Sequence, residues 1–370
     1  DGHRFLDFGA GIAVNALGHA HPAMVAALRE QAGRLWHVSN LYQIPEQERL
    51  AELLVAHTFA DTVFFGNSGT EAAELAIKMA RRYHDANGEP ERIGFVAFEG
   101  AFHGRSTGAI AAAGSEKMIK GFGPLMPGFT TLPWGDDAAL ECAITDRTCA
   151  VMVEPIQGEG GIRPLGTARL RRIRELCDAT GTLLILDEVQ CGMGRTGRLF
   201  AHEHTGITPD IMMVAKGLGA GFPIGATLAT ARAAAGMTAG SHGSTFGGNP
   251  LACAVGIVAL SIIAEPAFLA EVNRKGALLR EGLAGLVARH PALFGEVRGE
   301  GLMLGLACRM APGPLIEAAR DEGLLLVAAA HDTVRILPAL NIPDAAITDG
   351  LARLDRAAAT LSHQTAATAR

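Results

Sequence analysis

The sequence has few cysteines, and none of them are spaced as a disulfide framework or a zinc site would require. Six cysteines are scattered over 370 residues without a Cys-x-x-Cys pair. This usage is typical of reduced thiols in the cytoplasm, where we expect the protein to reside. Two His-x-His pairs begin at His19 and His202, but no third ligand stands at helical spacing. We therefore expect no metal site.

Long hydrophobic runs and blocks of positive charge are also missing. The longest apolar runs, such as residues 324–330, are far too short to span a bilayer. No signal peptide opens the chain, although it starts at Asp1 rather than at a methionine. The net charge is −6 and no basic block occurs, so neither nucleic acid nor a membrane is expected as a partner.

The chain does contain enough apolar residues for a large core, since 49% of its 370 residues are hydrophobic and 19% are charged. Short apolar runs alternate with alanine-rich helical stretches such as Thr70–Asp85 and Thr167–Ala179. The expected strands are Thr62–Phe65, Gly94–Phe98, Ala150–Val153, Leu183–Leu186 and Ile211–Val214. This alternation predicts an α/β fold with a mostly parallel, doubly wound sheet.

The pattern changes after about Leu260. A long helical stretch, Ala267–Arg289, precedes a region of shorter strands and one further helix, which is typical of a smaller α+β domain. We predict a large domain over residues 41–262 and a small domain over residues 263–370. Residues 1–40 are expected to form an N-terminal segment that packs with the small domain.

Polar residues follow the predicted strands at their carboxyl ends, where ligands bind in sheets of this kind. Asp187 ends one apolar run, and Lys216 follows the next one and enters a glycine-rich loop. A buried lysine can attach covalently to the aldehyde of pyridoxal phosphate, and a buried aspartate can keep its pyridine nitrogen protonated. Taken singly, a strand-end lysine is more often a solvated loop residue, and an aspartate there often caps a helix.

The segment from Phe65 to Glu71 is expected to be a tight turn that opens a helix. Glycine lets the backbone approach a ligand closely, and the first amides of a helix are unpaired donors that can bind a phosphate. Ser68 and Glu71, three residues apart, are equally compatible with a simple capping box.

Other strand ends carry side chains with two possible interpretations. Phe102 could stack on a flat cofactor or pack in the core, and Arg105 could bind a substrate carboxylate or face solvent. Glu159 lies in a glycine-rich loop and could pair with an arginine of the site or be an incidental charge of a solvent-exposed loop. Ser244 and Thr245 could bind phosphate or cap the following helix. The glycines at 217–221 and 9–11 lack the spacing of a dinucleotide-binding loop.

These segments together resemble the class III, fold-type I aminotransferases that depend on pyridoxal phosphate, and within them the acetylornithine aminotransferases. The resemblance extends over essentially the whole chain. Its most specific parts are Phe65–Glu71, Ala101–Arg105, Val153–Gly161, Leu184–Gly197, Ala215–Gly217 and Gly240–Pro250. The resemblance also leads us to expect that the family's usual N-terminal twenty-odd residues are missing from the sequence given.

The resemblance implies a role for each matching residue. Lys216 is similar to the lysine that holds the cofactor and moves protons, and Asp187 to the partner of the pyridine nitrogen. Gln190 is similar to a residue that reaches the phenolic oxygen, and Phe102 to the ring stacked on the cofactor. The phosphate would be held by Ser68, Gly69 and Thr70, and by Thr245 from the second subunit of a homodimer. Arg105, Ser244 and Arg335 match substrate-contacting positions, with Glu159 neutralising Arg335 when no carboxylate is bound.

The implied reaction moves the δ-amino group of N2-acetyl-L-ornithine to 2-oxoglutarate, giving N-acetyl-L-glutamate 5-semialdehyde and glutamate for arginine biosynthesis. Related donors are alternatives: N-succinyl-diaminopimelate, N-succinylornithine, ornithine or 4-aminobutyrate. A different pyridoxal-phosphate reaction, such as decarboxylation or amino-group migration, and a non-catalytic binding protein of the same fold are the remaining alternatives.

Overall fold

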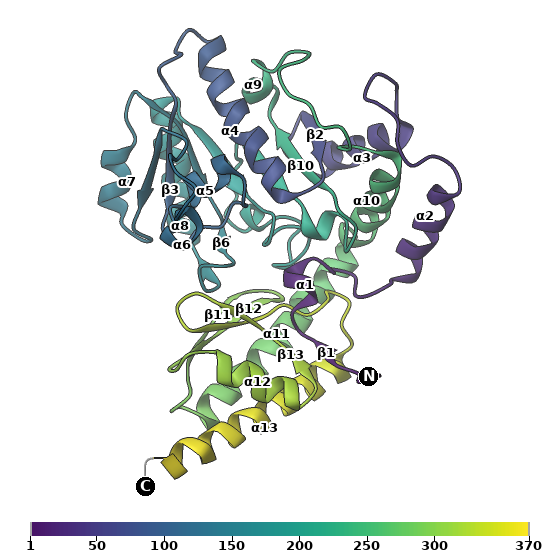
Figure 1. The fold of residues 1–370 in the computed structure, drawn as a ribbon, viewed down its shortest axis with the longest axis vertical. Coiled ribbons are helices and arrows are strands. Elements are labelled where there is room, and N and C mark those ends of the chain that lie inside the picture. Colours follow the sequence, from purple (N-terminus) through teal and green to yellow (C-terminus); the bar gives the residue numbers. More distant parts are fainter. Residues whose placement is uncertain (1, 369–370) are drawn as a thin grey trace.

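The computed structural model describes residues 2–368, with side chains described up to residue 363. The chain forms two lobes of unequal size that meet at a narrow waist (Figure 1). The larger lobe is built around a seven-stranded sheet and the smaller one around a four-stranded sheet. Residues 369–370 of the predicted small domain and Asp1 of the N-terminal segment lie outside the described part.

The large sheet has the strand order β2-β10-β9-β8-β5-β3-β4. Its strands are β2 (Thr62–Gly66), β10 (Gly225–Ala229), β9 (Ile211–Val214), β8 (Leu183–Asp187), β5 (Thr148–Val153), β3 (Gly94–Phe98) and β4 (Phe129–Leu132). Only β10 runs antiparallel to its neighbours, so the predicted mostly parallel sheet is confirmed. The central strands are buried along their whole length, as expected for a sheet covered on both faces.

Helices cover both faces of this sheet. On one face, α4 (Gly69–Ala86) and α5 (Thr107–Ala113) bury alanine and leucine side chains against the strands. On the other face, α8 (Thr167–Thr180) and α7 (Asp137–Ala143) bury leucine, isoleucine and cysteine side chains against the strands. The α/β fold class with helices on both faces is thereby confirmed.

Further helices cover the end of the sheet that carries β2. They are α3 (Pro45–His57) and α10 (Pro250–Ile263), which pack against each other beside the strands. None of the described helices is by itself long and apolar enough to cross a bilayer; one pair, α10 with α11 (Pro266–Arg289), reaches that length and composition but is bent by 68°.

The small lobe combines a four-stranded antiparallel sheet with long helices. Its strands are β11 (Phe294–Glu300), β12 (Met303–Cys308), β15 (Thr333–Ile336) and β14 (Val327–Ala329), in that spatial order. Its helices are α11, α12 (Gly313–Asp321) and α13 (Asp344–Thr368). Leucine and valine side chains of α11, α12 and α13 share one apolar cluster with β12 and β15.

The N-terminal residues contact both lobes. Strand β1 (Leu6–Asp7) pairs in parallel with β13 (Leu324–Leu325) beside the small sheet. Helix α2 (Pro22–Ala32), by contrast, packs against α10 of the large lobe. The domain boundaries at 40/41 and 262/263 stay a prediction.

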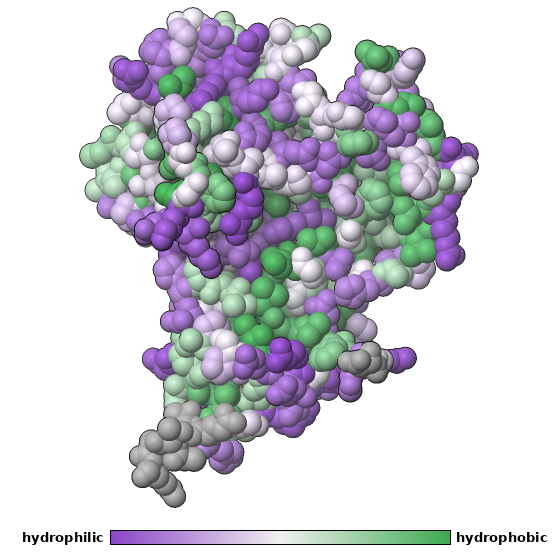
Figure 2. Space-filling view, viewed as in Figure 1, coloured by the Kyte–Doolittle hydropathy of each residue, from purple (hydrophilic) through white to green (hydrophobic). Residues whose placement is uncertain are grey.

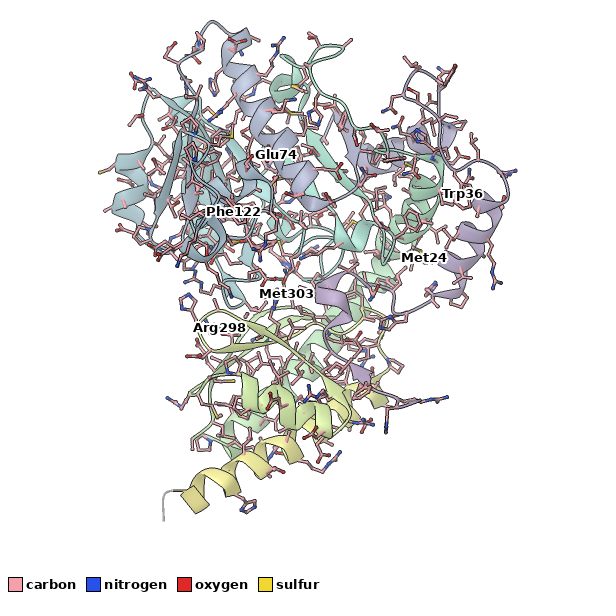
Figure 3. The ribbon with its side chains drawn as sticks, viewed as in Figure 1. Met24, Trp36, Glu74, Phe122, Arg298 and Met303 are labelled. Atoms are coloured by element: carbon pink, nitrogen blue, oxygen red, sulfur yellow. The ribbon has the colours of Figure 1, made fainter. Side chains whose placement is uncertain are left out.

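Apolar side chains also gather at the waist, where the two lobes meet (Figure 2). A small buried cluster there joins Ile156 and Ile162 of the large lobe to Met303 and Leu337 of the small one. Figure 3 shows Met303 at this junction. The small lobe is therefore held close to the carboxyl ends of the central strands.

Candidate active site

A cavity of about 400 Å³ opens at the carboxyl ends of the parallel strands. Five strand ends contribute to it, because β2, β3, β5, β8 and β9 all point the same way in the sheet. Of the predicted site residues, those that line the cavity are Ser68, Gly69, Thr70, Phe102, Arg105, Asp187, Gln190 and Lys216. Residues separated by up to about 150 positions in the chain are thus brought to one site.

Lys216 stands directly after Ala215, at the start of the turn that follows β9. Its backbone is left-handed, with φ of 45°, a conformation that a non-glycine residue adopts only where the surrounding structure enforces it. Burial lowers the pKa of its amine, and the nearby Arg335 charge acts in the same direction, while the charges of Glu159 and Asp187 oppose the shift. A lysine with a lowered pKa is more often the neutral, nucleophilic amine.

Asp187 is the last residue of β8, the strand next to β9, and only 3% of it is exposed. One carboxylate oxygen lies 2.8 Å from Nδ1 of His103, and the other accepts a hydrogen bond of 2.9 Å from the Val189 amide. Burial lowers the pKa of His103, but the hydrogen bond to Asp187 and the charges of Asp187 and Glu154 outweigh it and raise that pKa. The Asp187 contact therefore favours the protonated form of the His103 imidazole.

The turn after β2 presents the N-terminus of the long helix α4 to the cavity. Ser68 caps this helix by accepting a 3.3 Å hydrogen bond from the Glu71 amide, and the Glu71 carboxylate accepts from the Asn67 amide at 2.7 Å. At Gly69, an added Cβ would stand 3.0 Å from a methyl group of Val189, so a side chain would crowd this approach. The segment is both a capped helix start and a potential anion site, because the first amides of a helix carry partial positive charge.

The loop after β3 forms another wall. Phe102 faces the cavity, and the exposed guanidinium of Arg105 lies 5.3 Å from the centre of its ring. The Thr70 hydroxyl accepts hydrogen bonds from the amides of Arg105 (3.2 Å) and Ser106 (3.1 Å), and so ties this loop to α4. The backbone of Gly104 lies so close to Thr70 that an added Cβ would stand 2.3 Å from the Thr70 hydroxyl.

Arg335 extends from β15 of the small lobe and forms an ion pair with Glu159. Its Nη2 lies 3.1 Å from a Glu159 oxygen, its Nη1 bonds the other oxygen, and its Nη1 is also 3.4 Å from Oε1 of Gln190. The side chain of Arg335 is 2% exposed, whereas that of Glu159 is 33% exposed. Neither residue lines the cavity directly, but Gln190 connects the pair to it.

Ser244 and Thr245 lie outside this cavity. They line a second one of about 400 Å³, whose walls share only Asn67 and Thr70 with the first. The Ser244 hydroxyl accepts from the Gly247 amide at 3.1 Å, while Thr245 is exposed. Within this chain, neither residue reaches the cavity that holds Lys216.

Two buried groups of the site received no role from the sequence. His103 is paired with Asp187, and Glu154, which follows β5, lines the cavity with 4% exposure. Burial and the charge of Asp187 raise the pKa of Glu154 to about 7. Both belong to the polar strand-end residues of the sequence pattern, but their partners are distant in the chain and no local spacing reveals them. Within residues 2–368, no group of three or more His, Cys, Asp or Glu side chains is arranged to hold a metal ion.

Comparison with known proteins identifies the family. The aminotransferase class-III family matches residues 1–358. The acetylornithine aminotransferase of Rhodobacter capsulatus is 63% identical over 99% of this chain and 93% of its own length. The Mesorhizobium japonicum enzyme of that name is 57% identical over 95% of this chain and 88% of its own length.

Solved structures lead to the same family. Ornithine aminotransferase from Toxoplasma gondii superposes with a TM-score of 0.94 at 32% identity, covering 97% of this chain and 87% of that one. N-acetylornithine aminotransferase from Stenotrophomonas maltophilia superposes with a TM-score of 0.86 at 42% identity, covering 98% of this chain and 92% of that one.

The chain belongs to the class-III aminotransferase family, and the predicted fold-type I architecture is confirmed. It is a transaminase, and several of its relatives, between 49% and 63% identical, are acetylornithine aminotransferases.

Proposed function

We propose that this transaminase moves the δ-amino group of N2-acetyl-L-ornithine to 2-oxoglutarate, giving N-acetyl-L-glutamate 5-semialdehyde and L-glutamate in arginine biosynthesis. The observation that carries the chemistry is the placement of Lys216 and Asp187 at neighbouring strand ends in one cavity. The identity of 63% to an acetylornithine aminotransferase, over almost the entire chain, supports the substrate.

The residues of the cavity fit pyridoxal phosphate. The Lys216 amine has a lowered pKa, and the amides at the start of α4 suit a phosphate. Phe102 offers a ring face, and Gln190 an amide that can reach a phenolic oxygen. When bound, the cofactor supplies an electron sink for the bonds at the carbon that carries the amine.

The protein's own groups then orient the substrate and move protons. Lys216, as the neutral amine, would remove a proton from the carbon that carries the δ-amino group, and in the second half-reaction it would deliver a proton to the α-carbon of the glutamate formed from 2-oxoglutarate. Asp187 would hold the pyridine nitrogen of the bound cofactor in its protonated form, and the 2.8 Å contact with His103 Nδ1 fixes the position of the carboxylate. Arg105, exposed at the cavity rim, binds the α-carboxylate of acetylornithine as a bidentate partner.

The Glu159–Arg335 pair explains how one site accepts two unlike substrates. The reacting end of acetylornithine has no carboxylate, so the ion pair between Glu159 and Arg335 stays formed when this substrate binds. The reacting end of 2-oxoglutarate carries one, which takes the place of Glu159 on Arg335, while Arg105 binds the distal carboxylate. Ser244 is proposed as a further substrate contact.

We also propose a homodimer in which Thr245 reaches the phosphate of the partner's cofactor. Its exposed position outside the Lys216 cavity supports this arrangement. Nearby, Trp36, Leu41, Tyr42 and Phe246 are 59–85% exposed, which is unusual for large apolar side chains of a monomer. Trp36 lies at the outer edge of the large lobe (Figure 3). Light scattering on the purified protein should give about twice the chain's 38.5 kDa.

A cytoplasmic location completes the proposal, supported by six cysteines that are all free thiols. Spectral titration with N2-acetylornithine tests the activity: the absorbance of the bound aldehyde form should convert to that of pyridoxamine phosphate, and 2-oxoglutarate should restore it and yield glutamate. Turnover should be compared with N-succinyl-diaminopimelate, N-succinylornithine, ornithine and 4-aminobutyrate. A tenfold preference for any of these would overturn the substrate assignment.

A further inference from the structure

Glu154 is a buried carboxylate whose two oxygens hold two different loops of the site. It follows β5 directly and is 4% exposed. Its Oε2 accepts a hydrogen bond of 3.2 Å from the Phe102 amide, and its Oε1 accepts one of 3.3 Å from the Gly158 amide. In its ionised form, a carboxylate is acceptor-only and has two oxygens, so it can satisfy both donors at once.

The two amides belong to segments with different tasks. Phe102 is the aromatic wall of the cavity, and its loop continues to Arg105 at the rim. Gly158 precedes Glu159, whose carboxylate pairs with Arg335. Gly158 also lies tightly against Gln190, since an added Cβ would stand 2.3 Å from that side chain. Glu154 is thus the common anchor of the aromatic wall and of the loop that carries the switching carboxylate.

We propose that Glu154 is a positioning residue that couples these two segments, so that the Phe102 wall and the Glu159–Arg335 pair keep a fixed geometry relative to each other. The proposal rests on the proposed function, because it takes Phe102 and Arg335 as the cofactor and carboxylate contacts. Charged or titratable groups face Glu154 from several elements: Asp187, His103, Lys216, Cys191 and Arg163.

An amide side chain cannot replace this carboxylate. Glutamine has the same shape as glutamate but only one acceptor oxygen, and its NH2 group would face one of the two N–H donors. Glu154→Gln should therefore release either the Phe102 loop or the Gly158 loop. Glu154→Asp keeps both acceptor oxygens on a shorter stem and should retain part of the function.

Glu188 provides a matched control. It is also a buried carboxylate that accepts two backbone amides, those of Ala201 (2.7 Å) and His202 (2.8 Å), but it does not line the cavity. Glu188→Gln should lower thermal stability as any loss of a buried hydrogen bond does. It should leave the geometry around the cofactor unchanged.

The test compares the holoenzymes of the wild type, Glu154→Gln, Glu154→Asp and Glu188→Gln. For Glu154→Gln, we expect a loss of about half or more of the visible circular dichroism of the bound cofactor. We also expect a rise in the KM for 2-oxoglutarate of about tenfold, the effect of one unpaired buried donor, with a smaller change for acetylornithine. Glu154→Asp should restore part of both signals, and Glu188→Gln should alter neither.

A folded Glu154→Gln variant with wild-type dichroism and an unchanged ratio of the two KM values would overturn the proposal. If Glu154→Gln does not fold, the Glu154→Asp enzyme decides instead. The proposal would be overturned if Glu154→Asp and Glu188→Gln had the same visible circular dichroism and the same KM for 2-oxoglutarate. A wild-type protein that binds pyridoxal phosphate but does not use acetylornithine would instead refute the proposed substrate, and the dichroism comparison would still decide the role of Glu154.

Discussion

Replacing Glu159 with glutamine should make the site bind α-carboxylates more tightly. In the wild type, 2-oxoglutarate or glutamate must displace the Glu159 carboxylate, which lies 3.1 Å from Nη2 of the buried Arg335. Opposite charges about 4 Å apart attract by roughly 4 kcal/mol at an effective dielectric constant of 20. The Glu159 side chain is 33% exposed, so we discount this attraction to about 2 kcal/mol, which corresponds to about thirtyfold in affinity.

The assay is a spectral titration of each half-reaction. Glu159→Gln should lower the apparent Kd for glutamate by up to about thirtyfold while leaving that for acetylornithine within about threefold, so the preference for the acylated donor shrinks. The control is Glu296→Gln, which removes an exposed carboxylate 3.3 Å from Arg298 in the same sheet as Arg335. An unchanged ratio of the two dissociation constants in Glu159→Gln would refute the displacement mechanism.

Three further predictions follow from the geometry. Asp187→Asn should reduce kcat/KM about a thousandfold, since about 4 kcal/mol of charge stabilisation is lost; steady-state kinetics will measure it. Burial raises the pKa of Glu154 from its ordinary 4.5 to about 7, so the folded state binds the extra proton. The stability of the cofactor-free protein should therefore fall between pH 4.5 and 7 relative to Glu154→Gln, by up to about 3 kcal/mol in urea unfolding. Equal pH dependence of the two proteins would contradict that shift. Gly104→Ala should destabilise the protein and weaken cofactor binding, because φ is 130° and the new methyl group would meet the Thr70 hydroxyl at 2.3 Å; unaltered melting and cofactor titrations would count against it.

Most strands of the large sheet, and the polar residues at their carboxyl ends, could be predicted from local sequence patterns. Buried parallel strands must be apolar along their whole length, so runs such as Leu183–Leu186 stand out, and the polar residue that ends each run points to the ligand edge. Strands β4 and β10 were not predicted. β10 reads Gly-Ala-Thr-Leu-Ala, in which small residues carry little strand preference, and it is a strand because β2 and β9 enclose it.

The interactions that tune the site could not be predicted in the same way. His103 and Asp187 are 84 residues apart, and Glu154 and Phe102 are 52 apart, so each pair depends on how the strands are ordered in the sheet. The Glu159–Arg335 pair joins the two lobes across 176 residues and was expected only from the family resemblance. Local patterns thus indicate which residues belong to the site, whereas the tertiary structure determines which charged side chains pair with each other.

The most direct test of the central assignment is borohydride reduction of the yellow holoenzyme followed by peptide mapping. We predict one pyridoxyl adduct, on Lys216, and no adduct in a Lys216→Ala variant supplied with the same cofactor. An adduct on a different lysine, or a wild-type protein that stays colourless with pyridoxal phosphate, would contradict the account.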